Sequence, residues 1–324
     1  MIGLGRAGRA RLRAIKSLGL SLSAVASARP EEARASLEAF GFSEATRVYR
    51  DWRELLKDPE VKVTLICSEN QVHEAQARAS LLENHHVCVE FPLVSTSDAA
   101  RSLWTLADER NRVLHVEVIG TLTARHLLTR EWLKMSEAQP HQARPHRWRS
   151  TLNAGAYRWV SEALSAGEVM ILAFGRVYQA LSLFGPLVRS AVQLELETGS
   201  SEPSSSLELT FESRDGITVE IVERRESGLR RASQSALYDE RGQEITLEQM
   251  RADMEQAGLI ENANVQGEQT PLFEADLCHF LGLISQLDPR LAHLSEHPAV
   301  SCVSGYAQQD LLLAAQELCD ADPS

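Results

Sequence analysis

The chain opens with Met1-Ile2-Gly3-Leu4-Gly5-Arg6-Ala7-Gly8, and this stretch decides the fold of its first half. The spacing Gly-x-Gly-x-x-Gly is typical of the turn that joins a strand to a helix in a dinucleotide-binding fold. In such a turn Gly3 permits the tight bend, Gly5 lets the backbone approach a pyrophosphate, and Gly8 lets the helix pack closely. The helix N-terminus then faces the phosphates. We therefore predict that the cofactor is bound by Gly3, Gly5, Arg6, Ala7 and Gly8.

The residues on either side of this stretch bear on that interpretation. Residues 6–18 are rich in helix formers, and Gly19 stands where a glycine commonly closes a helix. Only Met1 and Ile2 precede the first glycine, although a strand of roughly five or six residues should lead into the turn. We therefore expect the first strand to be truncated here. An ordinary glycine-rich helix start is the alternative.

The composition indicates a water-soluble chain with room for two domains. Its 324 residues are 44% hydrophobic and 24% charged, which suffices for a full core. A formal charge of −12 opposes nucleic-acid binding, and no apolar run reaches the roughly 18 residues of a membrane helix. The five cysteines are scattered and never spaced as CxxC. We expect a monomer in the reducing cytoplasm that binds neither nucleic acid nor membrane.

The second predicted strand, residues 21–27, ends in Ser27-Ala28-Arg29-Pro30. A site selective for NAD usually has an acidic residue here, which holds the ribose 2′-hydroxyl. A hydroxyl and a guanidinium instead suit a 2′-phosphate. We therefore predict that Ser27 and Arg29 favour NADPH, with NADH bound more weakly. A solvated loop charge is the alternative for Arg29.

Strands and helices alternate as far as residue 117, which predicts a doubly wound parallel sheet of the Rossmann type over residues 1–120. Ligands of such sheets lie beyond the carboxyl ends of the strands. Polar residues that follow the strands at 61–67 and 86–89 are therefore expected at the cofactor: Ser68, Glu69, His73 and Glu90. For His73 a purely structural hydrogen bond is an equal alternative.

From residue 121 onward the pattern changes to long alternating strands, which predicts an α+β domain over residues 121–324. We expect an open antiparallel sheet with helices on one face and the other face available to a partner or substrate. Residues 188–196 are predicted to be a strand with Val188, Val192 and Leu194 on one face. Residues 200–206 are predicted to be a polar loop, and residues 272–283 and 306–318 to be amphipathic helices.

Arg176 stands among apolar residues in the predicted buried helix 168–184. A charge in such a setting is costly unless it meets a partner or lines a wet pocket. Arg176 is therefore a candidate for substrate contact, and a salt-bridged structural arginine is the alternative. A basic run, which a solvated face also explains, comprises Arg144, His146, Arg147, Arg149 and Arg158.

The motifs GLGRAG (3–8), LICSENQVHEA (65–75), HHVCVEFPL (85–93) and RVLHVEV (112–118) resemble the glucose–fructose oxidoreductase, inositol dehydrogenase and MocA superfamily. Within it they are similar to the biliverdin reductases, with a second match at 175–185. Sugar and cyclitol dehydrogenases of the superfamily carry a lysine where this chain has Phe91, and biliverdin reductases usually carry tyrosine. They also commonly continue His-x-Glu-His, where this chain has His115-Val116-Glu117-Val118.

The resemblance implies NADPH-dependent reduction of biliverdin to bilirubin, a step of heme degradation, by hydride transfer to the central methine carbon of this tetrapyrrole. It places Glu90, Phe91 and Arg176 at the catalytic site, with Arg176 holding or protonating the pigment. It also points to a C-terminal zinc site, but His297, Cys302 and Cys319 are loosely spaced, so we predict no metal.

Two other functions remain open at this stage. A sugar or cyclitol dehydrogenase is disfavoured by Phe91, because alcohol oxidation needs a base. A non-catalytic NADP-binding protein with a regulatory or partner-binding role is favoured by the changes after Glu117.

Overall fold

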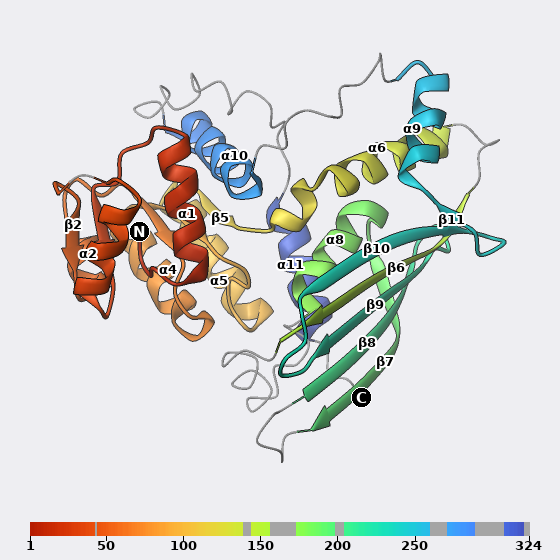
Figure 1. Ribbon diagram of the computed structural model, residues 1–324, viewed down its shortest axis with the longest axis horizontal. Helices are drawn as coiled ribbons and strands as arrows, with labels where there is room; N and C mark the ends of the chain where they lie inside the picture. Colours follow the sequence, from red (N-terminus) through yellow and green to blue (C-terminus); the bar gives the residue numbers. More distant parts are fainter. Residues whose placement is uncertain are drawn as a thin grey trace. The chain divides into compact units, whose positions relative to one another are not determined.

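The computed structural model describes residues 1–42, 44–138, 144–155, 173–197, 204–259, 271–288 and 308–320 (Figure 1). The chain forms two compact units. Unit 1 comprises Met1–Ile119 and Gln269–Gln309, and unit 2 comprises Gly120–Glu268 and Asp310–Ser324. The sequence analysis placed one boundary after residue 120. The contacts place the first crossing after residue 119 and return the chain to unit 1 at residue 269.

Unit 1 alternates short strands with helices. Its strands are β1 (Ala24–Ala26), β2 (Arg47–Tyr49), β3 (Val63–Ile66), β4 (His86–Val89) and β5 (Leu114–Val116). Its helices are α1 (Arg6–Ser17), α2 (Pro30–Ala39), α3 (Trp52–Leu56), α4 (His73–Leu82), α5 (Ser97–Glu109) and α10 (Leu272–Leu287), with a 3₁₀ turn at Asn70–Val72. The predicted parallel sheet is confirmed, since β1 pairs with β2, β3 with β4, and β4 with β5, all in parallel.

Met1–Gly3 occupy the centre of this sheet. Ile2 bridges in parallel to Ala26 on one side and to Ile66 on the other. Its amide donates to the Leu65 carbonyl at 2.8 Å, and its carbonyl accepts from the Cys67 amide at 2.8 Å. The strands therefore run in the order β2, β1, Met1–Gly3, β3, β4, β5, with the glycine turn directly after the central segment.

Helix α10 belongs to unit 1 because its apolar face completes the core beside α1. Leu277, Phe280 and Ile284 of α10 share one hydrophobic cluster with Leu12 and Ile15 of α1. Each such side chain contributes about 1.5 to 3 kcal/mol when fully buried. This burial accounts for the return of the chain to unit 1 long after the βα alternation has ended.

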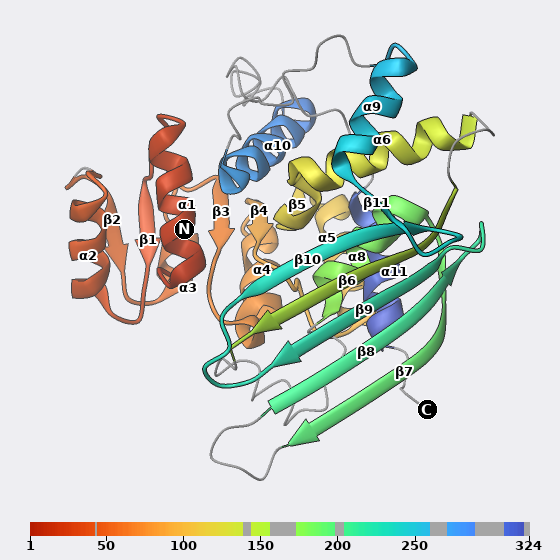
Figure 2. The same cartoon turned by 45° about the vertical axis from the view of Figure 1, so that its right-hand side comes forward.

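Unit 2 is built on a six-stranded sheet (Figure 2). Its strands are β6 (Pro145–Ala154), β7 (Leu187–Glu197), β8 (Ser204–Ser213), β9 (Thr218–Arg225), β10 (Ala232–Asp239) and β11 (Glu244–Ile245). Its helices are α6 (Ala124–Ala138), α8 (Phe174–Phe184), α9 (Leu247–Gln256) and α11 (Gln308–Asp320), after a 3₁₀ turn at Ile119–Leu122. The strand order is β11-β10-β6-β9-β8-β7. The predicted antiparallel arrangement holds except for β6 and β9, which pair in parallel.

Two local predictions for this sheet were wrong. Residues 204–206 belong to β8 instead of a loop, while residues 200–203 lie outside the described part of the chain. In β7 the register shifts between Arg189 and Ala191. This irregularity separates Val188 from Val192 and Leu194, and Val188 is 71% exposed.

The two faces of the sheet differ in character. One face is apolar and includes the buried side chains of Trp148, Phe211 and Ile221. On the other face Arg147 and Arg149 approach Glu220 at 4.0 and 3.7 Å. These two arginines of the basic run therefore have an acidic neighbour, as the solvated-face alternative requires. Arg158 lies outside the described residues. Among the described helices, none is both long and apolar enough to cross a membrane.

Candidate functional site

Five strands of unit 1 end at one edge of the parallel sheet, and a polar residue follows each of them closely. Ser27 follows β1, Arg50 follows β2, Ser68 lies two residues after β3, Glu90 follows β4, and Glu117 follows β5. Because this carboxyl edge is where such sheets bind ligands, it is the candidate cofactor site. The sequence analysis placed Ser27, Ser68 and Glu90 here, but it did not assign Arg50 or Glu117 to the site.

The glycine turn lies at this edge, between the central segment Met1–Gly3 and helix α1. Gly3 has φ +87°, and a Cβ atom there would lie 2.7 Å from the Cys67 carbonyl oxygen. A Cβ atom on Gly8 would collide with the Gly3 carbonyl oxygen. A Cβ atom on Gly5, in contrast, would meet nothing within 4 Å. Gly3 and Gly8 are therefore required by the turn itself, whereas Gly5 leaves open space at the N-terminus of α1, beside Arg6 and Ala7.

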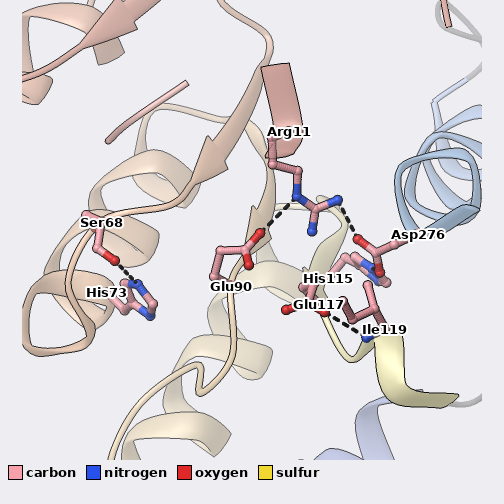
Figure 3. Close-up of polar contacts among 8 residues, drawn as sticks. All are labelled: Arg11, Ser68, His73, Glu90, His115, Glu117, Ile119 and Asp276. Atoms are coloured by element: carbon pink, nitrogen blue, oxygen red, sulfur yellow. Dashed lines mark hydrogen bonds and ion pairs between the residues drawn. The ribbon is translucent and has the colours of Figure 1, made fainter. Parts of the chain in front are cut away.

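His73 joins two of the loops at this edge (Figure 3). Its Nδ1 lies 2.8 Å from the Pro92 carbonyl oxygen, and its Nε2 lies 3.2 Å from the Ser68 carbonyl oxygen. The ring is fully buried, and burial lowers the pKa of His73. A neutral imidazole carries one N–H, so it donates to only one of these two carbonyl oxygens, and in either tautomer that hydrogen bond joins the start of α4 to a loop at this edge. Glu69, by contrast, is exposed.

Arg11 lies at the centre of a buried charge cluster, which we define as Arg11, Glu90, His115, Glu117 and Asp276 (Figure 3). Its guanidinium is 0% exposed, although it is the most strongly basic group in proteins. Arg11 Nε donates to Glu90 Oε1 at 2.9 Å, and Nη1 lies 2.6 Å from Asp276 Oδ2. The two carboxylates offset the cost of burying the cation. They also connect α1 to the end of β4 and to α10.

The other oxygen of Asp276 contacts His115 of β5. His115 Nε2 lies 2.8 Å from Asp276 Oδ1. The pKa of Asp276 is far below its ordinary value despite burial, because Arg11 and His115 both favour the carboxylate. Asp276 is therefore an anion that links the helix α10 to two other elements of unit 1.

Glu117 is the member of the cluster without a cation of its own. Burial and the nearby carboxylates of Glu90 and Asp276 raise its pKa well above the ordinary value. The pKa of Glu90 is also raised by burial. The Glu117 Oε1 atom accepts from the Ile119 amide at 2.7 Å. Both glutamates at the carboxyl edge of β4 and β5 therefore favour the protonated form more than an exposed glutamate does.

Cys88, His115 and Asp276 are the described residues that come nearest to a metal-binding arrangement, with their ligand atoms within 4.8 Å of one another. The donor set does not fit a metal ion well. Burial raises the pKa of the Cys88 thiol well above its ordinary value, whereas a metal requires the thiolate. Both oxygens of Asp276 are already engaged by Arg11 and His115. Of the C-terminal zinc candidates, Cys319 is buried on α11, and His297 and Cys302 lie outside the described residues.

Two charged residues that stand in apolar stretches of the sequence could have predicted this cluster. Arg11 lies beside Leu12, and Asp276 lies in the apolar run Leu272–Leu287. A charged residue in an apolar stretch requires a partner. The sequence analysis applied this argument to Arg176 alone.

Phe91 and Arg29 also lie on the surface of unit 1. Phe91, next to Glu90, is 37% exposed. Arg29 has a side chain that is 76% exposed, and its Nη1 lies 3.1 Å from Glu32 Oε2. The Arg29 amide donates to Ser27 Oγ at 3.2 Å, so the residues predicted to select the cofactor form one turn.

In unit 2, Arg176 is buried against the sheet by side chains from three strands. Its Nε lies 3.2 Å from Glu223 Oε1 on β9. Its Nη1 donates to Ser150 Oγ at 3.0 Å on β6, and its Nη2 donates to Ser233 Oγ at 3.3 Å on β10. Arg225 also contacts Glu223, at 3.1 Å. The salt-bridged arrangement is therefore present, with two guanidinium groups around one carboxylate.

The comparison with known proteins first gives the class. Residues 1–118 match the profile of the GFO/IDH/MocA family, described as an oxidoreductase family with an NAD-binding Rossmann fold. The first domain of the chain is therefore similar to that family of oxidoreductases. The family resemblance of the sequence motifs is confirmed.

Particular relatives follow from the longer matches. Biliverdin reductase A of Mus musculus is 27% identical over 249 residues, which are 75% of this chain and 76% of the mouse protein. Biliverdin reductase of Synechocystis sp. PCC 6803, solved with biliverdin and NADP⁺, is 20% identical with a TM-score of 0.59, covering 86% of this chain and 96% of that chain. Levoglucosan dehydrogenase, solved with NADH and levoglucosan, is 19% identical with a TM-score of 0.57, covering 74% and 72%. The two solved structures establish the fold alone.

The glycine turn yields a prediction that separates stability from cofactor binding. Gly3→Ala should destabilise unit 1 by about 2 kcal/mol or more, because the left-handed conformation and the Cys67 carbonyl both oppose a side chain. Gly5→Ala should cost about 1 kcal/mol or less in stability, yet weaken cofactor binding at least about tenfold by filling the space for the pyrophosphate. Urea unfolding and fluorescence titration with NADPH measure the two effects. Unimpaired cofactor binding by the Gly5 variant would contradict the assigned site.

The raised pKa of Glu117 yields a prediction about how the free energy of unfolding depends on pH. A carboxyl whose pKa is raised by folding contributes stability below its unfolded pKa, about 4.3 for Glu, and loses it as the pH rises toward the folded pKa. Glu117→Gln removes this titration and keeps an oxygen for the Ile119 amide. Urea unfolding at pH 5, 7 and 9 should therefore show the variant gaining on the parent by up to about 1.4 kcal/mol per pH unit within that window. Glu54→Gln, at an exposed position, is the control. If the free energy of unfolding of Glu117→Gln changed with pH in parallel with that of the parent, the raised pKa of Glu117 would be contradicted.

Proposed function

We propose that this oxidoreductase reduces biliverdin to bilirubin with NADPH, NADH serving less well. The observation that carries the proposal is Phe91, a half-exposed apolar ring directly after Glu90 at the carboxyl edge of the parallel sheet. The resemblance places a catalytic lysine at this position in sugar and cyclitol dehydrogenases. The similarity to mouse biliverdin reductase A over 75% of the chain supports the same assignment.

The chemistry that Phe91 permits differs from alcohol oxidation. A sugar or cyclitol dehydrogenase needs a base to take the hydroxyl proton. None of the residues that directly follow the five described strands is a lysine; these residues are Ser27, Arg50, Cys67, Glu90 and Glu117. Hydride transfer to a methine carbon needs a stacked, oriented cofactor and pigment and a source of one proton. An apolar ring suits stacking, whereas it cannot act as a base.

The pair Glu90 and Glu117 suits the proton that this reaction consumes. Burial with too few nearby cations to neutralise both carboxylates favours the protonated form of this pair. Glu90 is the neighbour of Phe91, so the proton is held one residue from the ring that we assign to the nicotinamide edge. Arg11 fixes Glu90 in place through the 2.9 Å hydrogen bond.

Arg176 is the residue we assign to the pigment in unit 2. Ser150 and Ser233 each accept one N–H of the guanidinium, and Glu223 lies 3.2 Å from Nε, so among the described residues each Nη nitrogen keeps one further N–H. Arg176 and Arg225 together exceed the charge of Glu223 by one. This excess of positive charge suits an anionic group such as a propionate of the tetrapyrrole.

The decisive assay follows the absorbance of biliverdin mixed with the protein and NADPH. We expect loss of the green pigment and appearance of yellow bilirubin, with a slower rate from NADH. The matched incubations contain levoglucosan or myo-inositol with NADP⁺ or NAD⁺. Turnover of a sugar or cyclitol without pigment reduction would assign the dehydrogenase alternative, and cofactor binding without any turnover would assign the non-catalytic one.

Arg176→Ala should lower biliverdin turnover about a hundredfold, equivalent to about 2.7 kcal/mol of transition-state stabilisation, with little change in NADPH affinity. Arg176→Lys should recover only part of the loss, because an ammonium group does not reproduce the guanidinium fork. Steady-state kinetics measure both variants, and circular dichroism verifies that they remain folded. Arg147→Ala, on the outer face of the sheet, is the control. Parental turnover by a folded Arg176→Ala variant would make Arg176 structural.

A further inference from the structure

We infer that Arg50, at the end of β2, is the main residue that recognises the 2′-phosphate of NADPH, with Ser27 beside it and Arg29 in a lesser role. The inference rests on the proposed use of a dinucleotide cofactor and names the residue that determines its specificity.

Strand register brings Arg50 to Ser27. Ala26 of β1 and Tyr49 of β2 are register partners in the parallel pair, and each is the last residue of its strand. The Ser27 amide donates to the Tyr49 carbonyl oxygen at 3.0 Å. Ser27 and Arg50 therefore leave neighbouring strands side by side at the carboxyl edge, although 23 residues separate them in sequence. In such a fold the strand that follows the glycine turn and its helix, labelled β1 here, ends near the adenosine ribose at this edge.

A carboxylate of helix α2, that of Glu32, competes with a phosphate for Arg29. Its guanidinium contacts both oxygens of Glu32, with Nη1 3.2 Å from Oε1 and 3.1 Å from Oε2. A phosphate that bound Arg29 would have to displace or face this carboxylate. The approach of two like charges lowers the gain from the contact.

Arg50 has no such competitor. Among the residues that the structure describes, none forms a hydrogen bond or an ion pair with its exposed side chain. The acid next to it in sequence, Asp51, caps α3 by accepting from the Arg53 amide at 2.9 Å and also contacts Arg53 Nη1 at 3.4 Å. Asp51 is thus already engaged by Arg53.

The arrangement fits a dianionic monoester. A guanidinium offers two parallel N–H donors to two phosphate oxygens, and the Ser27 hydroxyl can donate to a third. The unmodified ribose of NADH presents a neutral hydroxyl group to the same residues. Arg50 should therefore contribute to the affinity for NADPH and contribute almost nothing to the affinity for NADH.

The test compares four arginine variants of the full chain by fluorescence titration with NADPH and with NADH. Arg50→Ala should raise the dissociation constant of NADPH about twentyfold and leave that of NADH within about twofold. Arg29→Ala should raise the NADPH constant about threefold. Arg78→Ala, which changes an arginine of α4 that pairs with Glu74, should alter neither constant. Arg50→Lys should retain part of the preference, because it keeps the charge and loses the fork.

Each outcome of these titrations bears on the inference. An unchanged ratio of NADPH to NADH affinity in Arg50→Ala, with the preference lost in Arg29→Ala, overturns the role of Arg50. Equal affinities in the parent protein overturn the 2′-phosphate site but leave a dinucleotide enzyme. If neither nucleotide binds, both this inference and the proposed function fail.

Discussion

The burial of the Arg11 guanidinium is the constraint on which unit 1 depends. A permanently charged group that is 0% exposed must be neutralised by fixed carboxylates, and here they come from Glu90 and Asp276. These two residues lie 186 positions apart in sequence. The ion pairs therefore join the first helix, the end of β4 and α10, and they orient the element that returns to unit 1 after the chain has formed the sheet of unit 2.

The same cluster determines the chemistry available at the carboxyl edge of the sheet. Arg11 and His115 favour the anionic form of Asp276. Arg11 also faces Glu90, so its single positive charge is opposed by more than one carboxyl group. A proton is the least costly way to complete the balance in a buried site. A structural ion pair thus has a consequence for the edge where the glycine turn and Phe91 lie, because it favours the protonated form of a carboxyl there.

Unit 2 resolves a buried charge by a comparable rule and reaches a different result. Arg176 and Arg225 surround a single carboxylate, Glu223, and burial shifts the pKa of Arg176 downward and that of Glu223 upward. In unit 1 the carboxyls exceed the cations, whereas in unit 2 the cations exceed the carboxylate. The first arrangement favours a protonated carboxyl, and the second favours an added anion. In the proposed reaction, the first would supply a proton and the second would bind an anionic group of the substrate.

The sequence by itself determined the parallel sheet, the glycine turn and the use of a dinucleotide, because these depend on local patterns. Helix periodicity, β-rich runs and the spacing of Gly3, Gly5 and Gly8 each act over a few residues. It also placed Ser27, Ser68 and Glu90 at the carboxyl edge of the sheet, since each lies just beyond a predicted strand. Only the tertiary structure decided which charges meet. The pairing of Arg11 with Asp276 and of Arg176 with Glu223, and the placement of Ser27 on the strand next to that of Arg50, depend on strand register and helix packing between distant segments. A sequence pattern can show that a buried charge needs a partner, but the partner is chosen by the distances that the folded chain creates.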